Sequence, residues 1–216
     1  MRFSIKVGAR DSALSQCQIT EVLSELKTFH PLVEFDPLFV KTTGDLDLKT
    51  SLRNLDKTDF FTKEVDVMQL SGKCRIAIHS AKDLPDPLPQ GLAMIALTRG
   101  VDPSDVLVSS YSISSLPFNA KIGTSSLRRM ETILSLRSDL LCVDIRGTIP
   151  DRLAQLDAGH YDAVVMAEAA LIRLGLTHRS RIALPGPVAP LQGQLAILAQ
   201  ENDQEMQKLF ACLDCR

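Results

Sequence analysis

The apolar and polar residues of the chain follow two alternating periods. Residues 5–7 alternate as in a strand, and residues 14–29 carry apolar side chains at helical spacing. Asp11 or Ser12 is suited to cap this helix at its N-terminus. Residues 34–41 again have the pattern of a strand. The opening of the chain therefore predicts a strand, a helix and a second strand.

The same order continues through the rest of the sequence. Further strands are predicted at residues 75–78, 93–97, 106–109, 121–123, 140–145 and 163–166. Further helices are predicted at residues 61–71, 127–134, 149–156 and 169–174, and a last apolar helix is predicted to begin near Gly193. Residues 148–151 have the form of a capping box, which favours a helix start at that point. Residues 42–60 are polar and predict a loop.

Strands that alternate with helices predict an α/β fold with mostly parallel sheets. Connectors near residues 98–103 and 185–190 divide the elements into two sets. The first predicted lobe is 1–98, to which residues 191–216 return, and the second is 99–190. A central cleft between two such lobes is a common ligand site.

Composition narrows the classes of function. The 216 residues include 45 % hydrophobic residues, and 24 Lys and Arg stand against 26 Asp and Glu, which excludes overall disorder and disfavours a nucleic-acid binder. No apolar stretch approaches the ~20 residues that a membrane span needs. Five cysteines without an export signal argue against a disulfide framework and predict a reducing, cytoplasmic location. We expect a monomer with a small-molecule substrate.

Arginines and hydroxyl residues gather at three predicted strand-to-helix turns, at residues 8–12, 123–129 and 146–152. Such turns lie at the carboxyl ends of parallel strands, where ligands bind. Helix N-termini and arginine side chains both favour anions. The pattern predicts a small polyanionic ligand, and the alternative is that these arginines lie on solvated faces or pair with nearby aspartates.

A second candidate is the stretch from His79 to Asp83, which follows a predicted buried strand. Asp83 could stabilise a cationic intermediate and move protons, and Lys82 could hold a substrate carboxylate. The alternative is a surface ion pair. No metal is expected, because the histidines lack ligand spacing. The CxxC from Cys212 to Cys215 is interpreted as frayed, incidental thiols, and the other cysteines as core residues.

Several of these stretches match a known family in order along the chain. They are Gly8–Leu14, Thr43–Asp45, Phe61–Glu64, His79–Pro85, Asp102–Asp105, Gly123–Arg129, Arg146–Gly147 and Arg173–Leu176. With these motifs the chain resembles the hydroxymethylbilane synthases, also called porphobilinogen deaminases. The resemblance implies a two-lobed fold like that of the type II periplasmic binding proteins. It also implies a transferase of heme and tetrapyrrole biosynthesis that deaminates and polymerises porphobilinogen into the linear tetrapyrrole hydroxymethylbilane.

The resemblance also implies roles for individual residues and a cofactor. Asp83 matches the family's catalytic aspartate, with Lys82 beside it. The positions that match residues binding cofactor or substrate carboxylates are Lys82, Arg10, Ser12, Thr124, Ser126, Arg128, Arg129, Arg146, Arg152 and Arg173. The implied cofactor is a dipyrromethane primer, which the family holds as a thioether on a cysteine.

The sequence departs from the family pattern at several places. The third, cofactor-anchoring domain is expected to be absent, and no Gly-Gly-Cys pattern surrounds Cys212 or Cys215. The family's Gly-Gln-Gly-Ala-Leu-Ala-Ile-Glu reads here as residues 191–198, with Leu191 in place of the first glycine and Leu198 in place of the glutamate. The Gly-Lys-Gly of the family's mobile loop becomes Lys57-Thr58-Asp59, and the Asn after Arg-Gly becomes Thr148.

Three functions stay open on the sequence alone. The first is a shortened deaminase whose primer is held without a covalent bond or through a terminal cysteine such as Cys215. The second is a non-catalytic binding module for a pyrrole polycarboxylate or another small anion. The third is a fragment or degraded copy, against which the intact helix patterns and the retained Asp83 argue.

Overall fold

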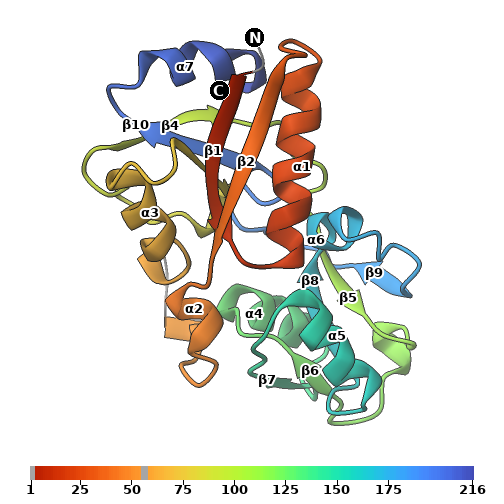
Figure 1. Cartoon of the computed structure of the whole chain (residues 1–216). Coiled ribbons are helices and arrows are strands. Elements are labelled where there is room, and N and C mark those ends of the chain that lie inside the picture. The colour runs from red at the N-terminus through yellow and green to blue at the C-terminus, as the bar shows by residue number, and fades with distance from the viewer. Residues whose placement is uncertain (1–2, 55–57) are drawn as a thin grey trace. The chain divides into compact units, whose positions relative to one another are not determined.

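The computed structural model describes residues 3–54 and 58–216 (Figure 1). The chain divides into two compact units. Unit 1 comprises residues 1–46, 57–101 and 194–216, and unit 2 comprises residues 47–56 and 102–193. Each unit is built on one five-stranded sheet with helices on both faces.

The sheet of unit 1 has the strand order β2-β1-β3-β10-β4. Its strands are β1 (Phe3–Arg10), β2 (Val33–Val40), β3 (Ile76–Ser80), β4 (Leu92–Leu97) and β10 (Leu195–Gln200). β1 runs parallel to β2 and to β3, whereas β10 runs antiparallel to both of its neighbours. The sheet is therefore mixed, with its parallel part at β2, β1 and β3.

The last predicted helix, near Gly193, is wrong, because residues 195–200 form the strand β10. The run from Leu195 to Ala199 is completely buried. A short apolar run that is buried on both faces of a sheet has no polar positions that would reveal its period, so it reads equally as a helix. The helix α7 (Gln204–Phe210) begins only after this strand.

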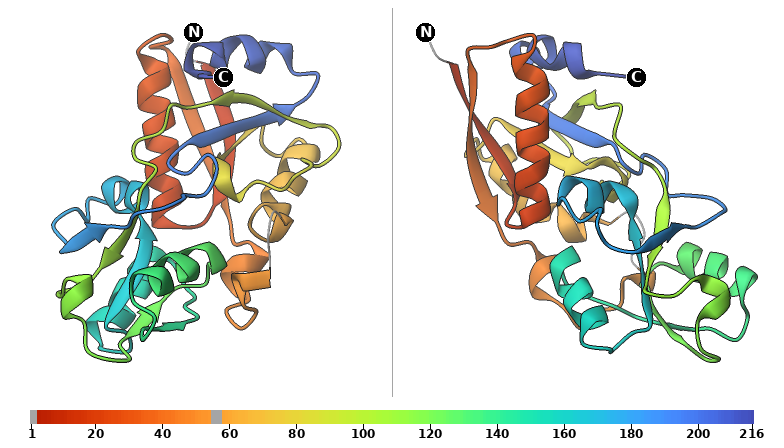
Figure 2. Two further views of the ribbon diagram at one scale, coloured as in Figure 1. Left: turned by 180° about the vertical axis from the view of Figure 1, so that it is seen from behind. Right: turned by 90° about the vertical axis from the view of Figure 1, so that its right-hand side faces the viewer.

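Helices cover both faces of the first sheet. One face packs against α1 (Ala13–Lys27) and α7, with Val22 and Phe210 in its core. The other face packs against α3 (Lys63–Leu70) through Val65. α1 runs beside β1 and β2 in both views of Figure 2. Of the two caps left open by the sequence, Ser12 is the one that caps α1.

The sheet of unit 2 has the order β7-β6-β8-β5-β9. Its strands are β5 (Asp105–Val108), β6 (Lys121–Gly123), β7 (Leu141–Val143), β8 (Ala163–Ala167) and β9 (Arg181–Ala183). β6 runs parallel to β7 and β8, and β5 runs antiparallel to β8 and β9. The edge strand β9 was not predicted. Its three residues are too few to show an alternating pattern, and two of them are exposed.

The helices of unit 2 also lie on both faces of its sheet. α4 (Leu127–Leu136) packs on one face through Ile133. α5 (Ile149–Asp157) and α6 (Glu168–Arg173) pack on the other face through Leu153 and Leu171. The predicted capping box is present, because Thr148 and Asp151 bond each other's backbone N–H groups. The cap fixes the start of α5 immediately after the third arginine-rich turn.

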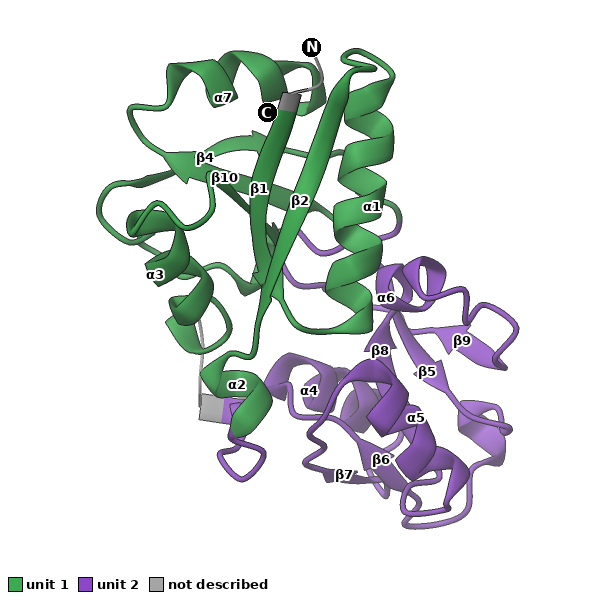
Figure 3. Cartoon of the chain, viewed as in Figure 1, with its two compact units in different colours: residues 1–46, 57–101, 194–216 green, residues 47–56, 102–193 purple. Residues whose placement is uncertain are grey.

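The stretch predicted as a loop contains short helical turns. They are α2 (Thr43–Leu46), η1 (Leu52–Asn54) and η2 (Asp59–Phe61); the other single turns of the fold are η3 (Ala81–Asp83), η4 (Ile113–Ser115) and η5 (Ala211–Leu213). Residues 47–56 group with unit 2, whereas the predicted boundaries placed them in the first lobe (Figure 3). Lys57, where the sequence departs from the family's loop motif, lies outside the described residues.

Candidate active site

The carboxyl edge of the first sheet brings together two stretches that the sequence singled out. β1, β2 and β3 run in the same direction, so the residues that follow them lie at one edge. Arg10 ends β1, Thr42 to Asp45 follow β2, and η3 with Lys82 and Asp83 follows β3. The predicted turn at residues 8–12 and the predicted turn around Asp83 therefore belong to the same edge.

Arg10 is held by a carboxylate and an aromatic ring of its own unit. Its Nη2 bonds Oδ1 of Asp45, and its Nε lies 3.4 Å from Oδ2. The guanidinium carbon lies 4.6 Å from the ring centroid of Phe61. Burial by itself would raise the pKa of Asp45, but hydrogen bonds from Arg10 and Thr42 outweigh it and lower that pKa. Asp45 and Phe61 lie in the matched motifs but were not proposed as site residues.

Ser12 has a structural task in the same turn. Its Oγ accepts the N–H of Ser15 at 3.1 Å and donates to the Ser15 hydroxyl at 2.9 Å. These bonds satisfy one of the free N–H groups at the start of α1. A role for Ser12 in ligand binding stays a prediction.

His79 is buried beside Arg10, with 5 % of its surface exposed. Burial, assisted by the positive charge of Arg10, lowers the pKa of His79 to about 4, so the imidazole is neutral at pH 7. Its Nε2 has no hydrogen-bond partner among the described residues. Within residues 3–54 and 58–216, no group of three or more His, Cys, Asp or Glu side chains is placed to bind a metal.

Asp83 differs from most other aspartates of the chain. It is half-buried in η3, yet within the described part of the chain its carboxylate has neither a hydrogen bond nor an ion pair. In particular, it forms no ion pair with the neighbouring Lys82, so the predicted surface pair is not formed between these two described residues. Ala81, the first residue of the turn, donates its N–H to the carbonyl of Gln194 at 3.0 Å. That bond fixes the turn against the start of β10.

The second sheet has an equivalent edge in unit 2. β6, β7 and β8 run in the same direction, and the antiparallel β5 begins at this edge with Asp105 opposite Ala167. Thr124 to Ser126 form the turn after β6. Thr124 is buried and its Oγ1 accepts the N–H of Ser126 at 3.3 Å, while Ser126 caps α4 by accepting the N–H of Arg129. Both predicted hydroxyl residues therefore shape the helix start.

Asp105 organises two arginines at this edge. It is 3 % exposed, and its Oδ1 accepts from Nε (2.9 Å) and Nη2 (2.6 Å) of Arg129 and from Nε2 of Gln192 (3.0 Å). Its Oδ2 lies 2.7 Å from Nη1 of Arg128. Burial by itself would raise the pKa of Asp105, but the charges and hydrogen bonds of the two arginines outweigh it and lower that pKa. Asp105 is therefore ionised at pH 7.

The two arginines differ in what they leave open. Arg129 is the more buried, and its Nη1 also reaches the carbonyl of Val165 at 3.4 Å. Among the described residues, Arg128 is held through Nη1, which forms an ion pair with Asp105 and donates a hydrogen bond to the carbonyl of Pro187 at 2.5 Å. No acceptor on the described residues bonds Nε or Nη2 of Arg128. These two nitrogens form the edge of the guanidinium that suits a bidentate carboxylate.

The remaining predicted arginines bond backbone carbonyls in unit 2. Arg146 bonds the carbonyls of Asp47 (2.8 Å) and Thr50. Arg152 donates to Gly147 and Arg173 donates to Gly193, both at 2.9 Å. Each of these three side chains has further interactions. Their predicted contacts with ligand stay predictions.

Arg53 is a neighbour of this edge that the sequence did not single out. Its Nη2 donates to the carbonyls of Cys142 (3.0 Å) and Thr124 (3.5 Å), and its Nε is buried without a partner on the described residues. With Arg146, it holds residues 47–53 on unit 2. Nothing in the sequence around Arg53 distinguishes it from a surface arginine, because its partners are carbonyls far away along the chain.

The C-terminal CxxC is not frayed at Cys215 as predicted, although this residue is exposed like Cys212. That the two thiols are incidental stays a prediction. The N–H of Cys215 donates to the carbonyl of Leu97 at 2.9 Å, and its Sγ lies 3.3 Å from the carbonyl of Thr98. Nε2 of Gln194 donates to the same Sγ at 3.5 Å. Cys212 is exposed, and Cys74 is the fully buried cysteine of the predicted core set, while Cys17 and Cys142 are half-buried. The tail is therefore bound to the end of β4.

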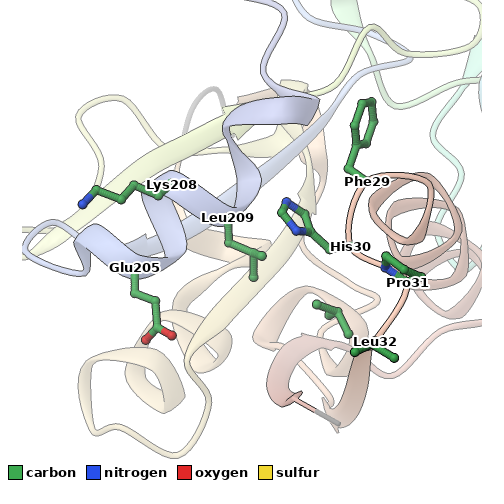
Figure 4. Close-up of a pocket in the computed structure, with 8 residues that line it drawn as sticks. Phe29, His30, Pro31, Leu32, Glu205, Lys208 and Leu209 are labelled. Carbon is green, nitrogen blue, oxygen red and sulfur yellow. The ribbon is translucent and has the colours of Figure 1, made fainter. Parts of the chain in front are cut away.

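An apolar pocket of about 540 Å³ lies elsewhere on unit 1 (Figure 4). It is lined by the connection between α1 and β2, with Phe29 and Leu32, and by α7, with Leu209. This place is at the amino end of β2, the opposite edge of the sheet from Asp83. In the described ranges of the chain, no helix is long and apolar enough to cross a membrane.

The two α/β units define a protein with the fold of the two-lobed substrate-binding proteins. A probable amino-acid ABC transporter extracellular-binding protein from Bacillus subtilis has a TM-score of 0.56 at 13 % identity and covers 99 % of this chain and 91 % of its own. A periplasmic substrate-binding protein of an ABC transporter from Coxiella burnetii has a TM-score of 0.56 at 15 % identity and covers 97 % and 91 %. At these identities the likeness concerns the fold alone.

Sequence similarity identifies the family. A family model described as "Porphobilinogen deaminase, dipyromethane cofactor binding domain" matches residues 5–208. The probable porphobilinogen deaminase of Chlamydia pneumoniae is 40 % identical over 98 % of this chain and 90 % of its own length. The probable porphobilinogen deaminase of Chlamydia muridarum is 42 % identical over 100 % of this chain and 88 % of its own length. The chain belongs to the porphobilinogen deaminase family, whose cofactor is dipyrromethane.

Proposed function

We propose that this chain deaminates porphobilinogen and joins the resulting pyrrole units into the linear tetrapyrrole hydroxymethylbilane. The observation that carries the proposal is the state of Asp83, a half-buried carboxylate with no protein partner among the described residues, at a sheet edge that also holds Arg10. Membership of the porphobilinogen deaminase family supports it. A structural aspartate at this depth would be expected to carry hydrogen bonds, as Asp45 and Asp105 do.

The reaction needs a group that tolerates positive charge and moves protons. Loss of ammonia from the aminomethyl group of porphobilinogen breaks a C–N bond and leaves an electron-poor methylene-pyrrole. The Asp83 carboxylate would stabilise that cation and would take up the proton released when the new C–C bond forms. A carboxylate already paired with an arginine would serve poorly, because its charge is neutralised and its lone pairs are occupied. The absence of an ion pair with Lys82 keeps Asp83 available.

The ligands of this reaction are acids, because each pyrrole carries acetate and propionate groups. Arg128 offers an open guanidinium edge, and we assign it the first contact with these carboxylates. Lys82, Arg10 and the other predicted residues of the two sheet edges complete the proposed set. Arg10 contributes less net positive charge than Arg128, because its Nε and Nη2 contact both carboxylate oxygens of Asp45.

The chemistry of the donor set fits a dipyrromethane cofactor, which carries four carboxylates on two rings. Arg128 would hold one of them through Nε and Nη2. The turn from Thr124 to Ser126 supplies further polar groups at the same edge as Arg128. When bound, the cofactor supplies the pyrrole end to which new units are added.

Product formation tests the proposed function directly. The purified chain is incubated with porphobilinogen, and released ammonia and uroporphyrin are measured. Turnover that is abolished in Asp83→Asn supports a deaminase, whereas binding of porphobilinogen without ammonia release would favour the non-catalytic binding module. Asp36→Asn, an exposed aspartate on β2, is the matched control.

Attachment of the primer is tested separately by intact mass. The chain is produced in a host that makes porphobilinogen and is denatured before mass spectrometry. A mass equal to the bare chain indicates a primer held without a covalent bond. An increase that disappears in Cys215→Ser but persists in Cys212→Ser places the bond on Cys215. A monomeric state and a cytoplasmic location stay predictions from the sequence.

A further inference from the structure

Asp105 lies between Arg128 and Arg129 and has no part in the proposed reaction itself. Asp105 begins β5 and is buried at the second sheet edge, where the turn after β6 and the start of α4 also lie. It does not face open solvent. Its Oδ1 is occupied by three protein donors, and its Oδ2 is paired with the Arg128 guanidinium without a hydrogen bond of ordinary geometry among the described residues. Its effect is therefore on the position and charge of the two arginines.

The hydrogen bonds of Asp105 are divided unequally between its two oxygens. Three donors converge on Oδ1, two from Arg129 and one from Gln192. They fix the rotation of the carboxylate. Oδ2 is then left with one contact, to Nη1 of Arg128 at 2.7 Å. The carboxylate is therefore fixed through Oδ1 and pairs with Arg128 through Oδ2.

Gln192 is itself fixed from both directions. Its Nε2 also donates to the carbonyl of Pro103 at 2.6 Å, and its side chain is buried. The next residue, Gly193, has a φ of +87°, and a Cβ atom built there would lie 2.6 Å from the carbonyl oxygen of Asp102. Only glycine fits this close approach of the two backbones. The support behind Asp105 is thus rigid.

The arrangement determines both the direction and the charge of the arginine pair. Nη1 of Arg128 forms an ion pair with Asp105 and donates a hydrogen bond to the carbonyl of Pro187, and these two contacts orient its Nε and Nη2 edge. Two guanidinium charges are balanced by one carboxylate charge. The pair therefore presents one net positive charge to a ligand, which matches a carboxylate better than a phosphate dianion.

We propose that Asp105 is a positioning residue that aims the open edge of Arg128 and limits the charge of the arginine pair, so that this place accepts a single carboxylate group and disfavours phosphate. The proposal rests on the proposed function in that the carboxylate belongs to a pyrrole. It adds a source of selectivity that the arginines alone would not give, because two unopposed guanidinium groups would bind phosphate readily.

The test compares Asp105→Asn with the wild-type chain in steady-state turnover of porphobilinogen, with inorganic phosphate as competing anion at constant ionic strength. In Asp105→Asn we expect KM to rise by about tenfold or more with a smaller change in kcat. We also expect phosphate to inhibit at a concentration at least fivefold lower than in the wild type. The matched control is Asp157→Asn, which removes a surface carboxylate paired with Arg179 in the same unit.

Two further variants separate charge from position. Asp105→Glu keeps the negative charge but moves the oxygens, so we expect a raised KM with a phosphate response like that of the wild type. Gln192→Leu removes one donor from Oδ1 and leaves the charge unchanged, so it should raise KM less than Asp105→Asn does. These variants also keep the proposal testable if Asp105→Asn does not fold.

The proposal is overturned if Asp105→Asn matches Asp157→Asn in KM and in its response to phosphate. It is also overturned if Asp105→Glu becomes as sensitive to phosphate as Asp105→Asn. If the wild-type chain makes no product, the proposed function fails. Phosphate binding is then measured as the rise of the melting temperature with phosphate concentration. Stabilisation of Asp105→Asn at a phosphate concentration at least fivefold lower than for wild type would still support the inference, and equal titrations would reject it.

Discussion

Two aspartates, one in each unit, are equally buried and have opposite surroundings. Asp66 on α3 in unit 1 and Asp105 on β5 in unit 2 are each 3 % exposed. Neither oxygen of Asp66 accepts a hydrogen bond of ordinary geometry from the described residues. Burial, together with the charges of Asp59 and Glu64, raises the pKa of Asp66 to about 6. The pKa of Asp105, which has two arginines and Gln192, is lowered instead.

The comparison shows that depth alone does not determine the state of an acid. Desolvation disfavours the charged form at both places, and only Asp105 has enough donors to reverse it. Asp83 is a third case. Like Asp66 it has no hydrogen-bond partner for its carboxylate among the described residues, but it is only half-buried, so solvent and ligand can reach it. An acid suited to chemistry needs this combination of few partners and access.

The largest expected effect comes from removing the uncommitted acid. Asp83→Asn should lower kcat by two to four orders of magnitude, the range that a proton-transferring group contributes, because the amide can neither take up a proton nor balance a cation. Since Asp83 has no partners on the described residues, the free energy of unfolding should change by less than about 0.5 kcal/mol. Ammonia release and thermal unfolding measure the two quantities. A large loss of stability would show that Asp83 is structural after all.

Much of the fold could be predicted because most elements show their period. α1, α4 and α5 have clear caps at Ser12, Ser126 and Thr148, and their apolar spacing is regular. β10 could not be predicted, since a completely buried strand has no polar positions that distinguish it from a helix. The antiparallel direction of β5 and β10 is likewise set by tertiary pairing and has no local signal.

The candidate site was predictable in its residue types and not in its pairings. The turns with Arg10, Asp83 and Arg128 were evident as motifs. The bond from Arg10 to Asp45 and the contacts of Asp105 join residues far apart in the sequence, so no spacing rule reveals them. Because a paired arginine and an open one have the same letter, the difference between Arg129 and Arg128 needed the structure.

The second prediction concerns Asp66, whose burial without hydrogen-bond partners among the described residues disfavours its charged form. Burial raises the pKa of Asp66 to about 6 in the folded chain, above its ordinary value of about 4, so the native state binds a proton more readily. Its contribution to stability is present below pH 4 and is lost as the pH rises through 6. Asp66→Asn should therefore stabilise the chain at pH 8 by on the order of 2–3 kcal/mol and much less at pH 4.

Urea unfolding of the wild type and of Asp66→Asn at both pH values measures this effect. Asp36→Asn is a suitable control, because that exposed aspartate has no burial to relieve. Equal destabilisation of Asp66→Asn at pH 4 and pH 8 would mean that the buried carboxyl is satisfied in solution, and the contrast with Asp105 would then disappear.

The third prediction tests the open edge that Asp105 supports. Arg128→Ala should weaken the binding of porphobilinogen by about 1.5–3 kcal/mol, the range of a hydrogen bond to a charged group. The dissociation constant is measured by calorimetry in the Asp83→Asn background, where the ligand is not consumed. Arg179→Ala, which removes an arginine paired with Asp157 at the surface, should leave it unchanged. An unchanged dissociation constant in Arg128→Ala would refute a direct contact.

The smallest expected effect concerns Leu191, which immediately precedes Gln192, the residue that donates to Asp105. Leu191 has a φ of +58°, a left-handed conformation that costs a residue with a Cβ atom about 1–2 kcal/mol. The family pattern has glycine at this place, and the leucine side chain is 40 % exposed, so little packing would be lost on its removal. The entropy that glycine adds to the unfolded chain offsets part of the gain. Leu191→Gly should therefore stabilise the chain by about 0.5–1 kcal/mol, as measured by urea unfolding, whereas Leu191→Ala keeps the strained Cβ and should give no gain. If the two variants were equally stable, the conformation at Leu191 would carry no strain, and the support of Asp105 would owe nothing to this turn.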